Sequence, residues 1–259
     1  MLPSYINIYG DGYNSILEVI DNSTATAVFD FSIDDSNNIT ISDLSIHGNK
    51  NNNLTSSVQA IAIHPTSSPM IYSKFNNLYI KEMSGTGISI YNSGADNIEI
   101  SGCLIRDCVK GNLYSTHLKY ASITDCKFRT AKTGYAGIFL EGVDNNHISI
   151  LGCHFDENAL YGLYATQAYD LVISNCGFYN NLGTAIYINR VNRLVFTGNV
   201  VINNLGFGML LEGTSTAYIN EHIISNNQFG YNNIHGKPSY GTFNVEQFNL
   251  CRQELLGIS

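Results

Sequence analysis

The sequence lacks tryptophan, holds only four prolines among 259 residues, and contains no run of apolar residues long enough to cross a membrane. A membrane-spanning helix needs about 20 such residues in a row, so no membrane span is expected. No long segment repeats its apolar residues with the period of a helix, which leaves little room for a bundle of helices.

Charged side chains are also few, at 13% of the chain, and acidic ones outnumber basic ones by 21 to 13, for a net charge of −8. Proteins that bind nucleic acids need a basic surface, so no nucleic-acid partner is expected. The net charge also disfavours tight unaided binding of a polyanion. An acidic polymer could still bind through a local patch of Arg or Lys, or through a bridging Ca²⁺.

The first residues, MLPSYINIYGDG, have neither a basic flank nor an apolar core, so they do not resemble a signal peptide. They already have the pattern of a strand and a turn in the middle of a fold. We therefore expect residues 1–259 to form a single domain that is a piece of a longer protein.

Six cysteines form no CxxC pair and no Cys/His spacing typical of a zinc site. Four of them, Cys103, Cys126, Cys153 and Cys176, share the context I-x-x-C-x-[IF] at spacings of 23, 27 and 23 residues. Such spacings indicate a structural repeat, in which we expect free, buried thiols that pack like small apolar side chains. Disulfides between stacked neighbours would need unusual geometry.

Asparagine, glycine and tyrosine are abundant, with 32, 23 and 17 residues, and they follow a repeat of about 23 residues. Seven segments align in register and define three columns. The first column is Leu44, Cys103, Cys126, Cys153, Cys176, Asn199 and Asn227; the second, five residues later, is Asn49, Cys108, Ala131, Asn158, Asn181, Asn204 and Asn232; the third, two residues after the first, is Ile46, Ile105, Phe128, Phe155, Phe178, Val201 and Phe229. A shorter segment, LYIKEM, is expected to add Met83 to the first column.

Another short alternating strand lies between these segments, as in GISIY, GIFLE, GLYAT and AIYIN, and no room remains for a crossover helix. Three short strands per period without helices must coil, so the sequence predicts an all-β, three-sided solenoid of about eight coils. Adjacent coils lie about 4.8 Å apart. Asparagines in the columns should then form a ladder, with side-chain amides bonded to the next coil, and the Phe column should fill the interior.

The Asn and Cys columns, the segment NITISDLSIHGNKNNN and the repeated GI-x-[IL]…N-x-x-I-S-x-[CN] together resemble the pectate-lyase-like superfamily, over nearly the whole chain. The resemblance implies a right-handed, single-stranded parallel β-helix. Members of that superfamily include pectate and alginate lyases, polygalacturonase-like hydrolases, uronate epimerases and viral tailspikes, and the fold alone does not select among them. The YG-[FI]-DPH signature of alginate epimerases and the GGxGxD nonapeptides that bind Ca²⁺ are absent.

Ligands in that superfamily lie along the face made by the GIxLx strands. The outward residues of these strands are therefore the candidate binding residues. The first outward column is Asp30, Ala62, Ser89, Tyr114, Phe139, Tyr164, Tyr187 and Leu210, and the second is Ser32, His64, Tyr91, Thr116, Glu141, Thr166, Asn189 and Glu212. Four successive coils thus carry aromatic rings, Tyr114 to Tyr187, over about 15 Å. This stripe fits an extended sugar chain, with Tyr91, His64 and Glu212 beside it; the alternative is ordinary core beneath covering loops.

Few charged groups lie near the stripe. Glu141 and Glu212 are three coils apart, about 14 Å, whereas the carboxylates of a glycosidase pair lie about 5 to 9.5 Å apart. A lyase or an epimerase instead needs a cation for the uronate carboxylate and a base for the adjacent proton. We expect Arg190 to supply the cation, His117 or Tyr164 to act as the base, and Glu141 to orient a sugar hydroxyl or to tune the base. An ordinary surface role is the alternative for each.

Asp144 and Asp170, in turns of neighbouring coils, could share a cation, so the expected cofactor is either none or Ca²⁺. A surface ion pair between Asp170 and Arg193 is the alternative. The leading hypothesis is an extracellular, cell-surface or virion-surface protein that binds and degrades an acidic, uronate-containing polysaccharide, as a lyase first and as a glycoside hydrolase or uronate epimerase second. The rival is a non-catalytic adhesin or structural β-helix, with other domains of its parent protein or a homotrimeric viral spike as partners.

Overall fold

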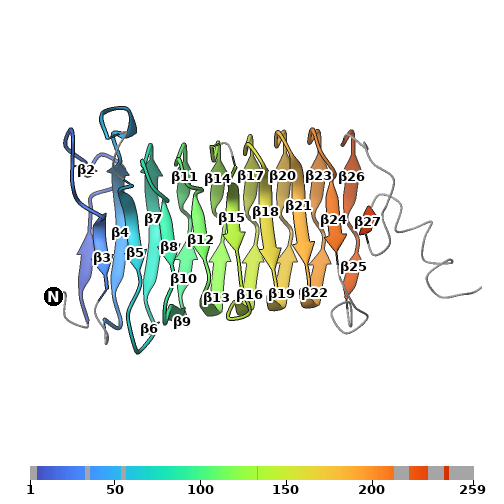
Figure 1. Cartoon of the computed structure of the whole chain (residues 1–259), viewed down its shortest axis with the longest axis horizontal. Helices are drawn as coiled ribbons and strands as arrows, with labels where there is room; N and C mark the ends of the chain where they lie inside the picture. The colour runs from blue at the N-terminus through green and yellow to red at the C-terminus, as the bar shows by residue number, and fades with distance from the viewer. Residues whose placement is uncertain are drawn as a thin grey trace, which may run out of the picture.

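In the computed structural model the chain winds into a parallel β-helix of about eight coils, stacked along one long axis (Figure 1). The structure describes residues 5–32, 36–53, 57–132, 134–212, 222–232 and 242–244. Within these ranges the only helix is one 3₁₀ turn, η1, at Lys50–Asn52. The predicted all-β solenoid is therefore confirmed.

Each coil contributes to three faces, two of them within an 18-stranded sheet and one within a nine-stranded sheet. The first face holds β1 (Asn7–Tyr9), β10 (Glu99–Ser101), β13 (Leu118–Thr124), β16 (Asn146–Leu151), β19 (Tyr169–Ser174), β22 (Asn192–Thr197) and β25 (Ile223–Ser225), with β6 (Met70–Ile71) and β9 (Ala95–Asp96) at its edge. The second face holds β2 (Ile16–Glu18), β11 (Leu104–Arg106), β14 (Lys127–Arg129), β17 (His154–Asp156), β20 (Gly177–Tyr179), β23 (Val200–Ile202) and β26 (Gln228–Gly230), and β4 (Thr40–His47) and β7 (Lys74–Lys81) run through both faces.

The nine-stranded sheet is the face that carries the GIxLx strands. It consists of β3 (Ala27–Phe31), β5 (Gln59–Ile63), β8 (Ile88–Ile90), β12 (Leu113–Ser115), β15 (Ala136–Leu140), β18 (Tyr161–Thr166), β21 (Thr184–Asn189), β24 (Met209–Glu212) and β27 (Thr242–Asn244). Its strands pair in parallel up to β24, whereas β27 pairs with β24 in the antiparallel direction, with Leu210 opposite Asn244. The last pairing therefore departs from the predicted all-parallel stack.

The three buried columns lie in the interior as predicted, with one correction. Leu78, and not Met83, occupies the first column, because β7 pairs Leu78 with Leu44 and Ile80 with Ile46. Met83 stands three residues after Ile80 and therefore falls in the second column, where it is fully buried. In the third column the rings of Phe128, Phe155 and Phe178 stack on one another at centroid distances of 5.3 and 4.5 Å.

Buried asparagines of the second column bond to one another from coil to coil. Asn181 Oδ1 accepts hydrogen bonds from the backbone N–H and the side-chain Nδ2 of Asn158, at 3.1 and 2.9 Å, and Asn204 Oδ1 does the same for Asn181. Each of these buried polar groups is thus paired, as burial requires. Cys103, Cys108, Cys126, Cys153 and Cys176 are buried free thiols, while Cys251 lies outside the described residues.

Asparagine and glycine are abundant because the coil corners need left-handed backbone. At the corner between the first two faces, Gly102, Asp125, Gly152, Asn175 and Gly198 have φ of 62°, 53°, 64°, 54° and 68°. Only Gly, Asn and Asp adopt this conformation readily. A Cβ on Gly102 would also lie 2.4 Å from the Asn77 side-chain oxygen.

Candidate functional site

The four predicted rings form a continuous stack on the nine-stranded sheet. Tyr114, Phe139, Tyr164 and Tyr187 pair in register from β12 to β21. Their successive ring centroids lie 5.7, 4.2 and 4.9 Å apart. All four side chains are partly exposed and none belongs to the buried core. The stripe is therefore a surface feature, and the alternative of ordinary core is not supported.

The first outward column is less uniform than the sequence predicts. Ala62 and Ser89 precede the stripe in the same column, yet both are buried. Ser89 is hydrogen-bonded to the side chain of Gln59 from the preceding coil. In the first outward column, exposed aromatic rings therefore begin at Tyr114.

Tyr161 adds a fifth ring that the sequence analysis missed. Its ring lies 5.2 Å from that of Tyr164 and 5.4 Å from that of Tyr187. Strict alternation along β18 would turn positions 161 and 164 to opposite sides. The ladder pairs Tyr161 with Ala136 and then resumes at Leu163, so alternation is interrupted at Gly162. A glycine between two tyrosines in a strand was the available signal for this interruption.

A cavity of about 390 Å³ opens at the end of the stripe where Tyr114 lies. Its lining includes Gln59, Tyr91, Lys110, Tyr114, Tyr135 and Glu141. Lys110 and Tyr135 come from the corners that precede β12 and β15, which the repeat columns do not cover, so the sequence analysis missed them. Lys110 makes no ion pair with any described residue.

Glu141 lies beside this cavity and is bonded to the stripe. The Tyr114 hydroxyl donates to Glu141 Oε2 at 3.0 Å, across one coil. Burial raises the pKa of the Tyr114 hydroxyl to about 12, and the hydrogen bond to the Glu141 carboxylate adds to the rise. Tyr114 therefore keeps its proton at neutral pH and can donate it.

The opposite end of the stripe repeats this Tyr–Glu arrangement. The Tyr187 hydroxyl donates to Glu212 Oε2, and burial together with this bond raises the pKa of Tyr187. Glu141 and Glu212 are three coils apart in the register, about 14 Å. This distance is too long for one carboxylate pair of a glycosidase, in agreement with the prediction from the sequence.

Arg190 and His117, the predicted cation and base, are not brought together. Both follow a strand of the nine-stranded sheet, but β12 and β21 are three coils apart, about 14 Å. His117 Nε2 lies 3.0 Å from Asp144 Oδ2 and its Nδ1 lies 2.9 Å from Thr116 Oγ1. Both ring nitrogens are thus engaged. The Nε of Arg190 is buried and has no hydrogen-bond partner among the described residues.

His64 and Tyr91 lie side by side in the second outward column. Their rings stack at 4.9 Å and 5°, and His64 Nε2 lies 3.0 Å from Asp30 Oδ1. Tyr91 also lines the cavity. These two predicted binding residues therefore extend the aromatic surface past the end of the stripe.

Asp144 and Asp170 have separate basic partners. Asp144 faces His117 and, at 3.9 Å, Lys119. Asp170 is bound by Arg193 at 2.5 Å and lies 3.0 Å from His147. Carboxylates neutralised by basic groups are poor ligands for a divalent cation, so this pair does not fit a shared Ca²⁺. In the described part of the chain no group of three or more His, Cys, Asp or Glu side chains could hold a metal ion.

A sequence profile of the family described as "Right handed beta helix region" matches residues 86–247. The chain belongs to this right-handed β-helix family. The predicted hand of the coil and the predicted superfamily are thereby confirmed. None of the curated protein sequences that were compared matches this β-helix. No helix among its described residues is long and apolar enough to span a membrane.

Several solved structures share the β-helix fold at low identity. The mannuronan C-5 epimerase AlgE6 A-module of Azotobacter vinelandii is 13% identical with a TM-score of 0.60, over 88% of this chain and 72% of that one. The AlgE4 A-module of the same organism is 12% identical with a TM-score of 0.56, over 90% and 83%. Tailspike protein gp49 of Acinetobacter baumannii bacteriophage Fri1, a capsular polysaccharide depolymerase, is 13% identical with a TM-score of 0.50, over 92% and 51%. Identities this low establish a common fold only.

Proposed function

We propose that this β-helix binds an acidic, uronate-containing polysaccharide along the aromatic stripe and cleaves it as a lyase in the cavity at the Tyr114 end. The observation that carries the proposal is the unbroken stack of rings that leads into a cavity holding both Lys110 and Glu141. Stacked rings suit the faces of sugars, and the lysine suits their carboxylates. The polysaccharide epimerases and the depolymerase that share the fold agree with a substrate of this class.

The cavity offers the groups that a β-elimination needs. Lys110, which has no ion-pair partner among the described residues, would neutralise the uronate carboxylate and stabilise the charge that develops on it. Glu141 would take the proton from the carbon next to that carboxylate. The bond from the neighbouring carbon to the glycosidic oxygen would then break, a carbon–carbon double bond would form, and Tyr114 would donate its proton to the leaving oxygen.

The other predicted residues take binding roles in this proposal. Arg190 lies at the far end of the stripe and would pair with a carboxylate several sugars away from Lys110. Two cations near opposite ends of an aromatic stack suit a long polyanion in spite of the net charge of −8. His117 is not proposed as the base, because Thr116 and Asp144 engage both of its nitrogens. Tyr164 would stack on a sugar, since burial raises its pKa and keeps it protonated.

Polymers of this kind cover cells, so the proposed location is a cell or virion surface. Assembly into a homotrimer would suit a viral spike and remains a prediction, testable by light scattering of the purified chain. Calcium bridging between polymer and protein also remains a prediction, which binding measurements with and without a chelator would test.

The test is a panel of alginate, polygalacturonate and hyaluronan, followed by ultraviolet absorbance, because a lyase creates a conjugated double bond. We expect one polymer to give a rising absorbance. Glu141→Gln should abolish the rise while the polymer still binds, and Lys110→Gln should lower both turnover and binding. Tyr231→Ala, which removes a tyrosine that is 91% exposed on a distant coil, serves as the control.

Other outcomes contradict the lyase mechanism in distinct ways. New reducing ends without the absorbance would indicate a hydrolase, and exchange of the proton beside the carboxylate with solvent, without chain cleavage, would indicate an epimerase. Binding without any reaction would identify a non-catalytic adhesin. Full turnover in Glu141→Gln would remove Glu141 from the mechanism.

A further inference from the structure

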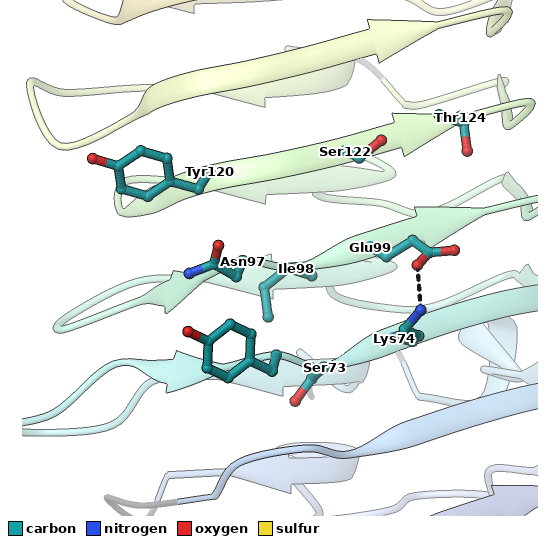
Figure 2. A pocket seen from close by; sticks show the side chains of 9 residues that line it. Ser73, Lys74, Asn97, Ile98, Glu99, Tyr120, Ser122 and Thr124 are labelled. Atoms are coloured by element: carbon teal, nitrogen blue, oxygen red, sulfur yellow. Dashed lines mark hydrogen bonds and ion pairs between the residues drawn. The ribbon is translucent and has the colours of Figure 1, made fainter.

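A second cavity, of about 400 Å³, lies on the 18-stranded sheet and not on the face of the stripe (Figure 2). Three consecutive coils build it in register. One column holds Tyr72, Asn97 and Tyr120, and the next holds Lys74, Glu99 and Ser122. In Figure 2, Asn97 and Tyr120 lie toward one end of the cavity and the Lys74–Glu99 ion pair lies toward the other.

The hollow arises from the alternation of long and short side chains at a corner. Tyr72, Asn97 and Tyr120 all have left-handed backbone, with φ of 54°, 55° and 49°. The two tyrosines are 59% and 54% exposed, and the shorter Asn97 lies between them. Their coils are two steps apart, about 10 Å. The Tyr120 ring stacks on His147 of the following coil at 4.6 Å, which leaves its other face for a ligand. Tyr72 and this face of Tyr120 can each stack on a sugar of one extended chain.

The charges of this cavity are balanced. Lys74 and Glu99 are its only charged lining residues, and they pair with each other at 2.7 Å. The side chains of Tyr72, Asn97, Tyr120 and Ser122 make no hydrogen bond with any described residue, so hydroxyl and amide groups are available for a ligand. The cavity therefore differs from the one at the stripe, where Lys110 has no ion-pair partner among the described residues.

We propose that this cavity is a second carbohydrate site, which binds an uncharged stretch of polysaccharide. One sugar ring stacks on Tyr72 and another on Tyr120, and Asn97 and Ser122 hydrogen-bond to the hydroxyls between them. The ion pair satisfies its own charges, so the site favours neutral sugars over uronates. This binding goes beyond the proposed lyase function and does not depend on it.

The test is electrophoresis of the intact chain through native gels that contain xyloglucan, galactomannan, dextran or hydroxyethylcellulose. We expect at least one of these neutral polymers to retard the wild type. Tyr120→Asn and Tyr72→Asn should each weaken this binding about fivefold, the loss of one stacked ring. Asparagine is the replacement because it accepts left-handed backbone and already stands between the two tyrosines. Tyr231→Asn is the matched control, because it removes an exposed tyrosine from left-handed backbone, with φ of 56°, on another coil.

Thermal melting of each variant keeps loss of binding separate from loss of fold. The second site is supported if the neutral polymer no longer retards Tyr72→Asn and Tyr120→Asn but still retards Tyr164→Ala. The proposal is overturned if no neutral polymer retards the wild type, or if the double variant Tyr72→Asn, Tyr120→Asn is retarded like the wild type. Loss of retardation in Tyr164→Ala alone would place neutral polymers on the stripe and also overturn it. None of these results depends on turnover of an acidic polymer, so the proposed lyase function stands or falls separately.

Discussion

Replacing Tyr164 by alanine tests the stripe most directly, because this ring stands in the middle of the stack. It lies 4.2 Å from Phe139, 4.9 Å from Tyr187 and 5.2 Å from Tyr161. An aromatic pair contributes about 0.5–1.5 kcal/mol beyond its buried area, and Tyr164 is partly exposed. We expect Tyr164→Ala to lower the free energy of unfolding by about 2 kcal/mol and Tm by about 5 °C, with the fold retained.

The same change should weaken binding of a uronate polymer. A sugar that stacks on Tyr164 loses about 1 kcal/mol, which is about a fivefold rise in Kd. Tyr164→Phe keeps the stack and loses only the hydroxyl, so its Tm and Kd should stay close to those of the wild type. Calorimetric melting and titration with whichever polymer of the panel binds would measure both effects.

Two results would refute this reasoning. If Tyr164→Ala binds the polymer as tightly as the wild type does, the stripe is not the binding surface. If the variant fails to fold at room temperature, the ring supports the core, and the groove must lie on another face.

Three further predictions follow from the buried columns and the stripe. Asn181→Ala removes the acceptor of the Asn158 backbone N–H and one of the donors to Phe155 O. The Asn158 N–H is then buried without a partner, whereas Phe155 O stays in the ladder between β17 and β20. We expect a loss of about 2 kcal/mol in urea unfolding, against less than about 0.5 kcal/mol for the exposed Asn14→Ala, and equal losses would contradict the role of the column. The five buried cysteines should not react with Ellman's reagent until the chain unfolds, because they are out of reach of the reagent and burial raises the pKa of Cys108 and Cys153 to about 12. Rapid reaction of more than one thiol in the native protein would show that the buried cysteines are accessible to solvent. The pKa of Tyr114 in the folded protein lies above its usual value of 10, so the stabilisation that this proton provides should be complete below pH 10 and lost as the pH rises through about 12. In Tyr114→Phe the melting temperature should therefore decrease less steeply between pH 10 and pH 12 than in the wild type. An equally steep decrease in the variant would show that Tyr114 does not cause it.

The sequence predicted the repeating part of this molecule well, because periodicity reports a repeating environment. The columns through Cys126 and Phe155 and the stripe through Tyr164 all lie where the alignment placed them. The exception among the columns is Met83. The left-handed corner residue of β7 is Asn77 and the first-column residue that follows it is Leu78, so the segment LYIKEM enters the column five residues earlier than predicted.

The cavities could not be predicted in the same way. Lys110 and Tyr135 stand at corners, and Tyr72 and Tyr120 stand at another corner, outside the columns that the alignment defines. Side chains at corners are set by loop length and left-handed backbone more than by a repeating pattern. The separation of His117 from Arg190, by contrast, follows from the columns of the alignment, in which the strands before these two residues stand three coils apart.

The coil from Cys126 to Cys153 holds 27 residues where its neighbours hold 23, yet the strands on either side of it remain in register. The additional residues stand at its corners, and one of those corners presents Tyr135 to the cavity. Length at a corner is thus decoupled from packing in the interior. During evolution such proteins can therefore gain or lose residues around the ligand one corner at a time, with the core left unchanged. For the same reason, a protein engineer could graft corner segments to alter sugar preference at little risk to stability.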